Sequence, residues 1–587
     1  MLTPTPLSGH SIYSTRCGMA PESVDLAIRF LLRVRTVFCL PNKVSGKNNS
    51  VIFVALLTLI FLSGIEVCMG GDTRALVIGK VAIEQRQVFD DPDTSLLHII
   101  APLANQFHIL TDEEVIRREL LFKEGDPYDQ RLIDESARNL RKLQIIGDVR
   151  ILQDTLADST VNMTVSTRDR WTLYPAMSLR QGGGVTGFGV SVRDDNFFGT
   201  AQKLNVGYNR LSDRTHPNGG EAGFTEPRLF GSWWTTSVQF KYADELRQTS
   251  FDVERPFYTE ATTWAARAYA DAGRVRVRQY ESGVLTHENY LNQQDQIAWV
   301  ATSTDDDTRL QLAAGYVRTR TNSDTLLVRP FDNVDLALAS ISILRRNYFK
   351  GNHLDNFNRV EDVPVGYQAG LTIGRNLHFS HAGDVDYFTR LFGQLNFGNG
   401  TELYGNYQAS VTSYFIGNVP NEMIVAATAI QNWRFTENQT LLGRITTTIG
   451  SHLAPTSQVI LGSFTGLRGY TNNELTGQRM LLMNFEERSY SGLTVWFLKF
   501  GGALFVDSGM LWNEGEGFGG QRFHSSVGLG IRVESSKNVG LGIFRFDIAY
   551  NLDQHRVGLI ISTDHLFHAI TPMEYVQPIP VPTQQMH

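Results

Sequence analysis

The chain has almost no cysteine, and beyond residue 70 it has none. Its three cysteines are Cys17, Cys39 and Cys68, so the long remainder of the chain carries no thiol. This absence excludes a cysteine-based metal cluster and a thiol nucleophile from that region. It also suits export to an oxidising compartment, where stray cysteines would form disulfides.

An excess of positive charge and long apolar runs are missing as well. The net charge is −7 and the pI is near 6.1, so we expect no nucleic-acid partner. No stretch after residue 70 approaches the roughly 18 apolar residues of a membrane-spanning helix. The chain nevertheless contains 52 Gly, 20 Tyr and 34 Phe at a mean hydropathy of −0.17. A membrane β-barrel produces this combination, because its strands alternate lipid-facing and lumen-facing residues.

The sequence also lacks a G-x-S-x-G nucleophile elbow and histidine pairs at metal-ligand spacing, so we expect no enzyme activity, metal or cofactor. Residues 182–187 fit the dinucleotide pattern G-x-G-x-x-G, which requires a helix after the glycines. Residues 188–193 alternate like a strand instead, which predicts a hairpin turn. Asp305, Asp306 and Asp307 are predicted to form a solvated turn rather than a calcium loop.

The N-terminal region, residues 1–70, is interpreted as an extension and a signal peptide. An apolar run of about 15 residues, 51–65, follows a series of basic residues and has the length of a signal-peptide core. We expect the mature protein to begin between about residues 65 and 72. An uncleaved signal anchor is the alternative. Glu66 and Val67 do not match the small residues that precede a lipidated cysteine, which disfavours lipidation of Cys68.

Residues 71–170 are predicted to form a small α/β domain. Strand-like residues 75–89 precede a first helix near Thr111, where Thr111 and Glu114 have the spacing of a capping box. Gly125 and Pro127 interrupt this helix, and a second helix follows Asp129. Two short strands, residues 148–153 and 160–167, complete a βααββ unit.

From residue 171 to 567, apolar and polar residues alternate with a period of two. Val527, Leu529 and Ile531, for example, alternate with two glycines and Arg532. The same pattern recurs in residues 203–209, 236–242 and 545–551. A soluble sandwich would need a second sheet to cover the apolar face, so we predict a transmembrane antiparallel β-barrel. Turn spacing allows 16 to 20 strands, with a first strand near residues 172–180 and a last one near 557–563.

Several motifs follow one another along this region. Residues 122–129 (FKEGDPYD) lie in the α/β unit, and DDNFFGT lies at 194–200. Leu467, Arg468, Gly469 and Tyr470 form the most specific motif; NFEER, FVDSG and RFDIAY follow at 484–488, 505–509 and 545–550. In this order the motifs resemble the BamA/TamA-type proteins of the bacterial surface antigen superfamily, whose barrels follow polypeptide-transport-associated (POTRA) domains. The resemblance covers roughly residues 75–567 and implies a POTRA domain and 16 strands.

The resemblance implies that the loop around Arg468 folds back into the lumen, where its arginine pairs with carboxylates. The alternation offers Glu486, Asp507 and Asp547 as partners. A guanidinium suits this role because its planar fork binds a carboxylate bidentately and stays charged. An ordinary exposed loop arginine is the alternative interpretation.

Two further sets of residues follow from the resemblance. Gly558, Ile561 and Phe567 are the nearest equivalents of a terminal-strand recognition signal, ahead of a polar, Pro-rich tail at 568–587. Val149 and Ile151 lie on the predicted edge strand of the POTRA unit, which we expect to bind extended client segments. The chain shows one such unit, whereas the familiar insertases carry several.

The function implied is the insertion of β-barrel proteins into the outer membrane, or translocation across it, through a lateral seam. We expect the barrel in the bacterial outer membrane and the POTRA unit in the periplasm. The expected partners are the bilayer, unfolded outer-membrane or secreted clients, and accessory periplasmic proteins. The alternatives are a two-partner-secretion transporter for a dedicated substrate, a passive structural barrel or channel, and a barrel enzyme.

Overall fold

The structure is a computed structural model of the whole chain. It describes residues 76–88, 108–143, 145–156, 159–212, 216–244, 246–259, 262–304, 307–323, 333–355, 361–377, 385–400, 402–453, 457–495, 498–535, 543–563 and 565–573. The expectations for residues 1–70, including the signal segment and its cleavage, lie outside the described residues. So do Asp305 and Asp306, and the tail beyond residue 573.

A small α/β domain precedes the barrel. Its elements are β1 (Val77–Arg86), α4 (Glu113–Glu119), α5 (Gln130–Lys142), β2 (Ile146–Thr155) and β3 (Thr160–Asp169). The three strands form one sheet in the order β1-β3-β2, with β1 parallel and β2 antiparallel to β3. Both β1 and β2 therefore lie at edges of this sheet. Among the described residues, no helix is long and apolar enough to cross a membrane.

The two helices begin at aspartates that cap them. Asp112 accepts a hydrogen bond from the backbone N–H of Glu114, and Asp129 caps α5 in the same way. The expected cap, Thr111, is wrong by one position. Its hydroxyl donates instead to the buried Asp169 carboxylate at 2.8 Å, which leaves the next residue to cap the helix.

The core of the α/β domain lies between its helices and its sheet. Alternate residues of β3 point into this core, as the burial of Val161, Met163 and Val165 shows. Ile116 of α4 and Leu140 of α5 are fully buried against them. The sheet is thus covered by helices on one face, and the apolar stripe of α5 decides which face that is.

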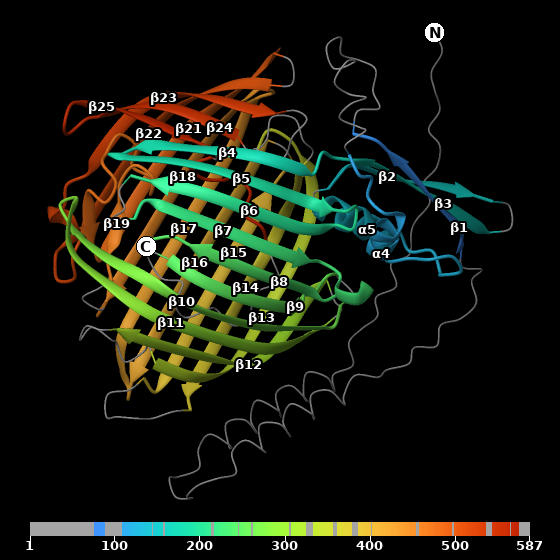
Figure 1. Cartoon of the computed structure of the whole chain (residues 1–587), viewed down its shortest axis with the longest axis horizontal. Coiled ribbons are helices and arrows are strands. Elements are labelled where there is room, and N and C mark those ends of the chain that lie inside the picture. The colour runs from blue at the N-terminus through green and yellow to red at the C-terminus, as the bar shows by residue number, and fades with distance from the viewer. Residues whose placement is uncertain are drawn as a thin grey trace, which may run out of the picture. The chain divides into compact units, whose positions relative to one another are not determined.

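The second part of the chain is a closed antiparallel barrel of 20 described strands. Figure 1 shows them in chain order from the cyan β4 to the red β25. Only β19 and β20 lie outside the barrel wall, where they pair with each other. The strands are β4 (Leu173–Gly182), β5 (Val185–Phe197), β6 (Gln202–Leu211), β7 (Asn218–Glu226), β8 (Thr235–Tyr242), β9 (Leu246–Arg255), β10 (Trp264–Glu281), β11 (Val284–Ser303), β12 (Thr308–Ser323), β13 (Asn333–Gly351), β14 (Glu361–Asn376), β15 (Tyr387–Gly398), β16 (Leu403–Ile416), β17 (Val419–Thr436), β18 (Gln439–Ser451), β19 (Val459–Leu461), β20 (Leu475–Gly477), β21 (Arg479–Val495), β22 (Leu498–Trp512), β23 (His524–Ser535), β24 (Ile543–Asn551) and β25 (Arg556–Ser562).

The predicted transmembrane barrel is confirmed, and its strand number is the upper end of the expected range. The 16 strands implied by the resemblance are too few. The barrel begins with six short strands, β4 to β9, of 8 to 13 residues each. The predicted first and last strands correspond to β4 and β25.

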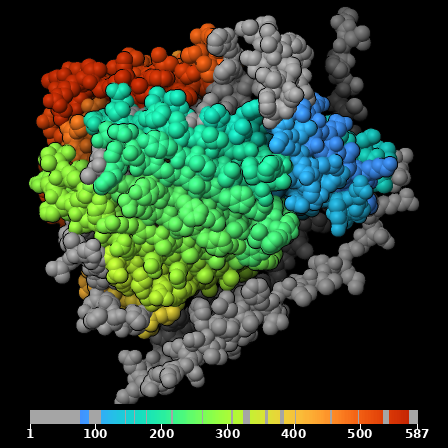
Figure 2. All heavy atoms as spheres, viewed as in Figure 1, coloured from blue at the N-terminus to red at the C-terminus, as the bar shows by residue number. Residues whose placement is uncertain are grey.

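Side chains alternate between the two faces of the barrel wall. On β22, Leu504 and Val506 are exposed, whereas Phe505 and Asp507, which alternate with them, are buried. β24 repeats the pattern, since Ile548 is exposed and Asp547 is fully buried. Figure 2 shows part of the outer surface, formed by the cyan and green strands. The outer face is thus apolar, as lipid requires, and the lumen is lined by charge.

The antiparallel order assigns every strand end to one of two ends of the barrel. β4 begins next to the α/β domain, and we call this the domain end; the opposite end is the far end. Successive strands of the wall run in opposite directions, so each strand ends where the next one begins. The β13–β14 turn and the end of β25 therefore lie at the domain end. The segment between β18 and β21 enters from the far end.

Candidate functional site

The chain between β18 and β21 returns into the barrel instead of extending away from it. We call residues 457–478 the lumen loop. Its short strands β19 and β20 pair with each other, and Leu467 and Tyr470 between them are buried. They pack in a cluster with Val459, Leu461, Met480 and Leu482. Apolar burial therefore holds the loop against strand β21.

Arg468 lies at the centre of the loop with no exposed surface, and three carboxylates surround it. Its Nε and Nη2 donate to the two oxygens of Asp507 at 2.7 and 2.9 Å, which is a bidentate pair. Its Nη1 donates to Glu486 at 2.8 Å and to Asp547 at 3.3 Å. The guanidinium carbon also lies 3.3 Å from the ring centroid of Phe505. The structure thus brings together all four residues that the sequence analysis proposed.

Further arginines on the inner wall extend this site into a charge network. Arg488 donates to Glu486 at 2.9 Å, and Arg532 donates to Asp547 at 2.5 Å. Arg545 lies 3.4 Å from the same aspartate. Each of these arginines is almost fully buried. Sequence reasoning did not propose them as site residues, although their inward positions in the alternation were a usable signal. Four buried cations thus face three buried carboxylates.

Two glycines allow the loop to approach the last strand. Gly469 has a φ of +87°, a conformation that favours glycine. A Cβ added to Gly558 of β25 would lie only 3.0 Å from the Cα of Gly469. The motif glycine and one residue of the expected terminal-strand signal are therefore in direct backbone contact. Tyr470 completes the docking by donating from its hydroxyl to Asp553 at 2.6 Å.

Residues 374–558 match the family model described as the Omp85 superfamily domain. The matched region contains the lumen loop, Arg468 and its three carboxylate partners. This part of the barrel is therefore similar to the Omp85 superfamily domain.

Solved structures similar to this chain include BamA from Haemophilus ducreyi lacking POTRA domains 1–3, at 10% identity and a TM-score of 0.37. That match covers 82% of this chain and 84% of that one. CdiB from Escherichia coli matches at 10% identity and a TM-score of 0.41, over 89% and 99% of the two chains. CdiB from Acinetobacter baumannii matches at 10% identity and a TM-score of 0.39, over 92% and 98%. No curated protein matches the sequence.

The barrel closes between its first and last strands, β4 and β25. In this seam the register contains a single residue pair, Ile561 with Gln181. The ladder between β4 and β5, in contrast, runs over the whole of β4, from Leu173 to Gly182. The seam is therefore the least extensively paired junction of the described barrel wall. Ile561, the second residue of the expected terminal signal, makes this closure.

Phe567, the third of these residues, is not part of the last strand, so this expectation is wrong. β25 ends at Ser562, and Phe567 is buried in the lumen. The ring packs against Leu354, Val363, Tyr404 and Leu442 on the inner wall. An apolar pocket inside the barrel thus takes up the aromatic ring that was expected to belong to the terminal-strand signal.

The β4–β5 hairpin turn is the G-x-G-x-x-G segment, and no helix follows it. Gly183 has a φ of +57° and contacts the lumen loop, where its carbonyl accepts a hydrogen bond from the N–H of Asn472 at 2.9 Å. The prediction of a hairpin turn beside the seam is confirmed. The lumen loop consequently touches both seam strands, β4 through Asn472 and β25 through Gly469.

The α/β domain presents β2 as an edge strand. Val149 and Ile151 pack their side chains on the domain core, and in the described residues β2 pairs only with β3. The domain contacts barrel turns through Glu119, which accepts a hydrogen bond from Arg228 at 2.6 Å. Burial raises the pKa of Glu119, and the charge of Arg228 opposes this shift.

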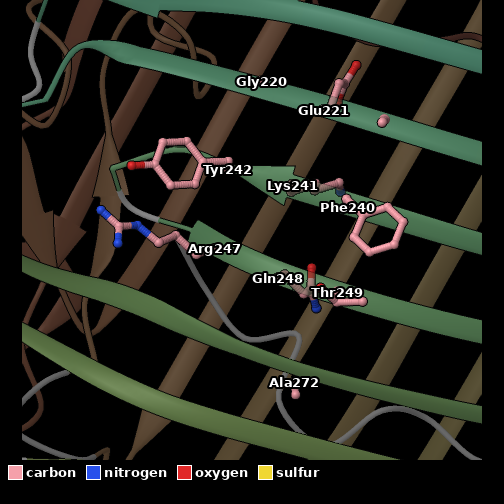
Figure 3. A pocket seen from close by; sticks show the side chains of 10 residues that line it. Gly220, Glu221, Phe240, Lys241, Tyr242, Arg247, Gln248, Thr249 and Ala272 are labelled. Carbon is pink, nitrogen blue, oxygen red and sulfur yellow. The ribbon is translucent and has the colours of Figure 1, made fainter.

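A groove of about 490 Å³ lies on the wall formed by strands β7 to β10. Figure 3 shows Tyr242 and Phe240 on one strand and Arg247 on the next. Phe240 and Tyr242 are exposed, and the guanidinium of Arg247 lies 4.7 Å from the ring centroid of Tyr242. Aromatic and arginine side chains of this kind are typical where a barrel meets the edge of the bilayer. Over the described part of the chain, no group of three His, Cys, Asp or Glu side chains is arranged to hold a metal.

Proposed function

We propose that this protein inserts β-barrel proteins into the outer membrane, or moves proteins across it, by opening the seam between β4 and β25. The observation that carries the proposal is the single registered pair, Ile561 with Gln181, in that seam. An open strand edge in a bilayer must find backbone partners, because no water is present to satisfy its N–H and C=O groups. The edge would therefore pair readily with an incoming client strand.

The lumen loop would control this opening. It contacts both seam strands, and it is held in place by the buried pairing of Arg468 with Asp507, Glu486 and Asp547. A loop fixed at this point would hold β4 and β25 together where it touches them, so the seam would open along the rest of its length. The network therefore acts as a structural clamp in the proposal, which includes no catalytic step.

The α/β domain would deliver clients as a POTRA unit on the periplasmic side. Its edge strand β2 offers backbone groups to an extended segment, and such pairing makes little demand on sequence. Low sequence demand suits a factor that handles many clients. A transporter for one dedicated substrate would be expected to add specific side-chain pockets.

Depletion of the protein, followed by quantification of the outer-membrane proteome, tests this function. We expect a broad loss of β-barrel proteins, with their unfolded forms accumulating in the periplasm. Loss of one secreted substrate alone would favour the dedicated transporter. An unchanged proteome would contradict an assembly role and favour a passive barrel.

A further inference from the structure

The chain does not leave the barrel when β25 ends at Ser562. Residues 565–573, which we call the C-terminal segment, run across the domain end of the lumen. Their contacts lie on the inner wall made by β13 to β16, β18 and β21, far from β25 in sequence. The segment therefore occupies the lumen at the end opposite to the lumen loop.

Side chains around the lumen form hydrogen bonds with the backbone of this segment at six of its nine residues. Both oxygens of Asp355 accept N–H groups, from Ala569 at 2.6 Å and from Ile570 at 2.9 Å. Inner-wall side chains donate to the segment's carbonyls: Arg488 to Phe567 at 2.8 Å, Asn396 to Thr571 at 3.2 Å, Gln394 to Pro572 at 3.4 Å and Arg346 to Met573 at 2.6 Å. Contacts to backbone groups of this kind suit any extended peptide.

One side-chain pocket adds an anchor to these backbone contacts. The ring of Phe567 is only 5% exposed and lies in the apolar pocket described above. The guanidinium carbons of Arg444 and Arg488 lie 4.7 and 5.5 Å from its centroid. Ala569 and Met573 are also buried. An aromatic ring flanked by cations is a favourable anchor.

We propose that this inner wall is a binding site for an extended polypeptide segment with one aromatic residue, and that the C-terminal segment occupies it as a displaceable plug. Because the plug is tethered to β25, its effective concentration at the site is high and it fills the site in the resting protein. An incoming client segment of the same character replaces it. The displacement step rests on the proposed function, whereas the plug itself does not.

The plug is linked to the lumen loop through strand β21. Glu486 accepts hydrogen bonds from Arg468 of the loop and from Arg488, and Arg488 in turn binds the plug. A continuous chain of charge-assisted contacts thus joins the elements that fill the two ends of the lumen. Displacing the plug removes a partner from Arg488 and so changes the contacts of the network that reaches Arg468.

Thiol labelling of the full-length chain tests the plug. The background for the experiment replaces the three native cysteines, Cys17, Cys39 and Cys68, by serine. Met573 is 2% exposed, so the thiol of Met573→Cys should react slowly with a membrane-impermeant maleimide. Arg346→Ala removes a donor to the plug and should accelerate labelling severalfold. Arg345→Ala, an exposed neighbour on the same strand, is the matched control and should leave the rate unchanged. Rapid labelling without any further substitution would overturn the proposal.

A second experiment does not depend on those variants. Deleting residues 564–587 should raise the conductance of the barrel in planar bilayers severalfold. A synthetic peptide of residues 564–573 should restore the low conductance, and the same peptide with Phe567→Ala should not. Unchanged conductance after the deletion would contradict the proposal that this segment closes the lumen, provided that the shortened barrel is folded and still resists heat on gels.

Displacement is then tested with an unfolded β-barrel protein as the client. Its addition should accelerate labelling of Met573→Cys, and a client lacking aromatic residues in its last strand should do so less. Slow labelling at every client concentration would overturn displacement and leave the plug as a static closure. These readouts need no assembly activity, so they fail or succeed separately from the proposed function.

Discussion

At the scale of single residues, Arg468 determines whether the lumen loop stays docked. Its guanidinium is fully buried against three carboxylates, so Arg468→Ala leaves those carboxylates without their shared cation. Breaking a buried pair in this way typically costs about 3–5 kcal/mol. We expect the folded barrel to unfold at a markedly lower temperature. The measurement is the temperature at which heating the sample shifts the barrel from its folded to its unfolded position on a gel. Arg468→Lys should be intermediate, because it keeps the charge and loses the bidentate fork.

The control for this substitution is Arg479→Ala at the edge of the same loop. Arg479 is partly exposed and lies 3.4 Å from Glu514, a contact of the kind that contributes little. Its removal should leave the barrel nearly as heat-resistant as before. Equal losses for Arg468→Ala and Arg479→Ala would mean that the buried network does not hold the loop.

Gly558 tests the contact between the loop and the last strand. An added Cβ would meet the backbone of Gly469 at 3.0 Å, so Gly558→Ala should push the loop away from β25. Overpacking of this kind typically costs about 1–3 kcal/mol. Gly502→Ala is a matched control, because its Cβ would meet no atom closer than 3.9 Å. Denaturant unfolding of both variants checks the expectation, and equal midpoints would contradict it.

At the scale of elements, β2 is the part of the α/β domain that we expect to bind clients. Val149→Pro removes one backbone donor from this edge strand and fixes φ. If the variant domain folds, both client binding and outer-membrane assembly should fall. Arg150→Ala, which alters an exposed side chain of the same strand and no backbone donor, should leave both unchanged. Normal assembly by a folded Val149→Pro variant would count against client capture at β2.

The elements also show where sequence reasoning succeeds and where it stops. The period-two alternation predicted a barrel and assigned Glu486 and Asp547 to its inner wall, because each strand follows a strict geometry. Alternation carries no information about a chain that leaves its strand, so Phe567 was assigned to the terminal-strand signal although its ring enters the lumen. Asp112 displaced Thr111 as the helix cap because Asp169 binds the threonine hydroxyl, a contact between distant residues.

The same limit applies to the charge network. A short motif identified Arg468, and the inward carboxylates followed from the alternation. Arg488 pairs with Glu486 on the same strand, β21, and Arg532 pairs with Asp547 across the adjacent strands β23 and β24. Their roles therefore depend on side-chain conformation and strand register, which the alternation alone does not give.

At the scale of the whole molecule, the barrel is filled from both ends and weakly paired along one seam. The lumen loop enters from the far end and the C-terminal segment from the domain end. Between them, Glu486 contacts arginines that belong to both systems. Among the described strands of the barrel wall, only the seam between β4 and β25 lacks an extended ladder. We therefore predict that function requires this seam to open.

A reversible disulfide across the seam tests that claim most directly. Gln181→Cys with Ile561→Cys joins the one registered pair, because facing residues of antiparallel strands lie about 4.5–5.5 Å apart between Cα atoms, within disulfide range. The matched control is Leu179→Cys with Phe188→Cys, which joins β4 to β5. In a background without other cysteines, reconstituted assembly of a β-barrel client should stop when the seam pair is oxidised and return on reduction, while the control pair stays active throughout. Full assembly by the oxidised seam variant would contradict the account.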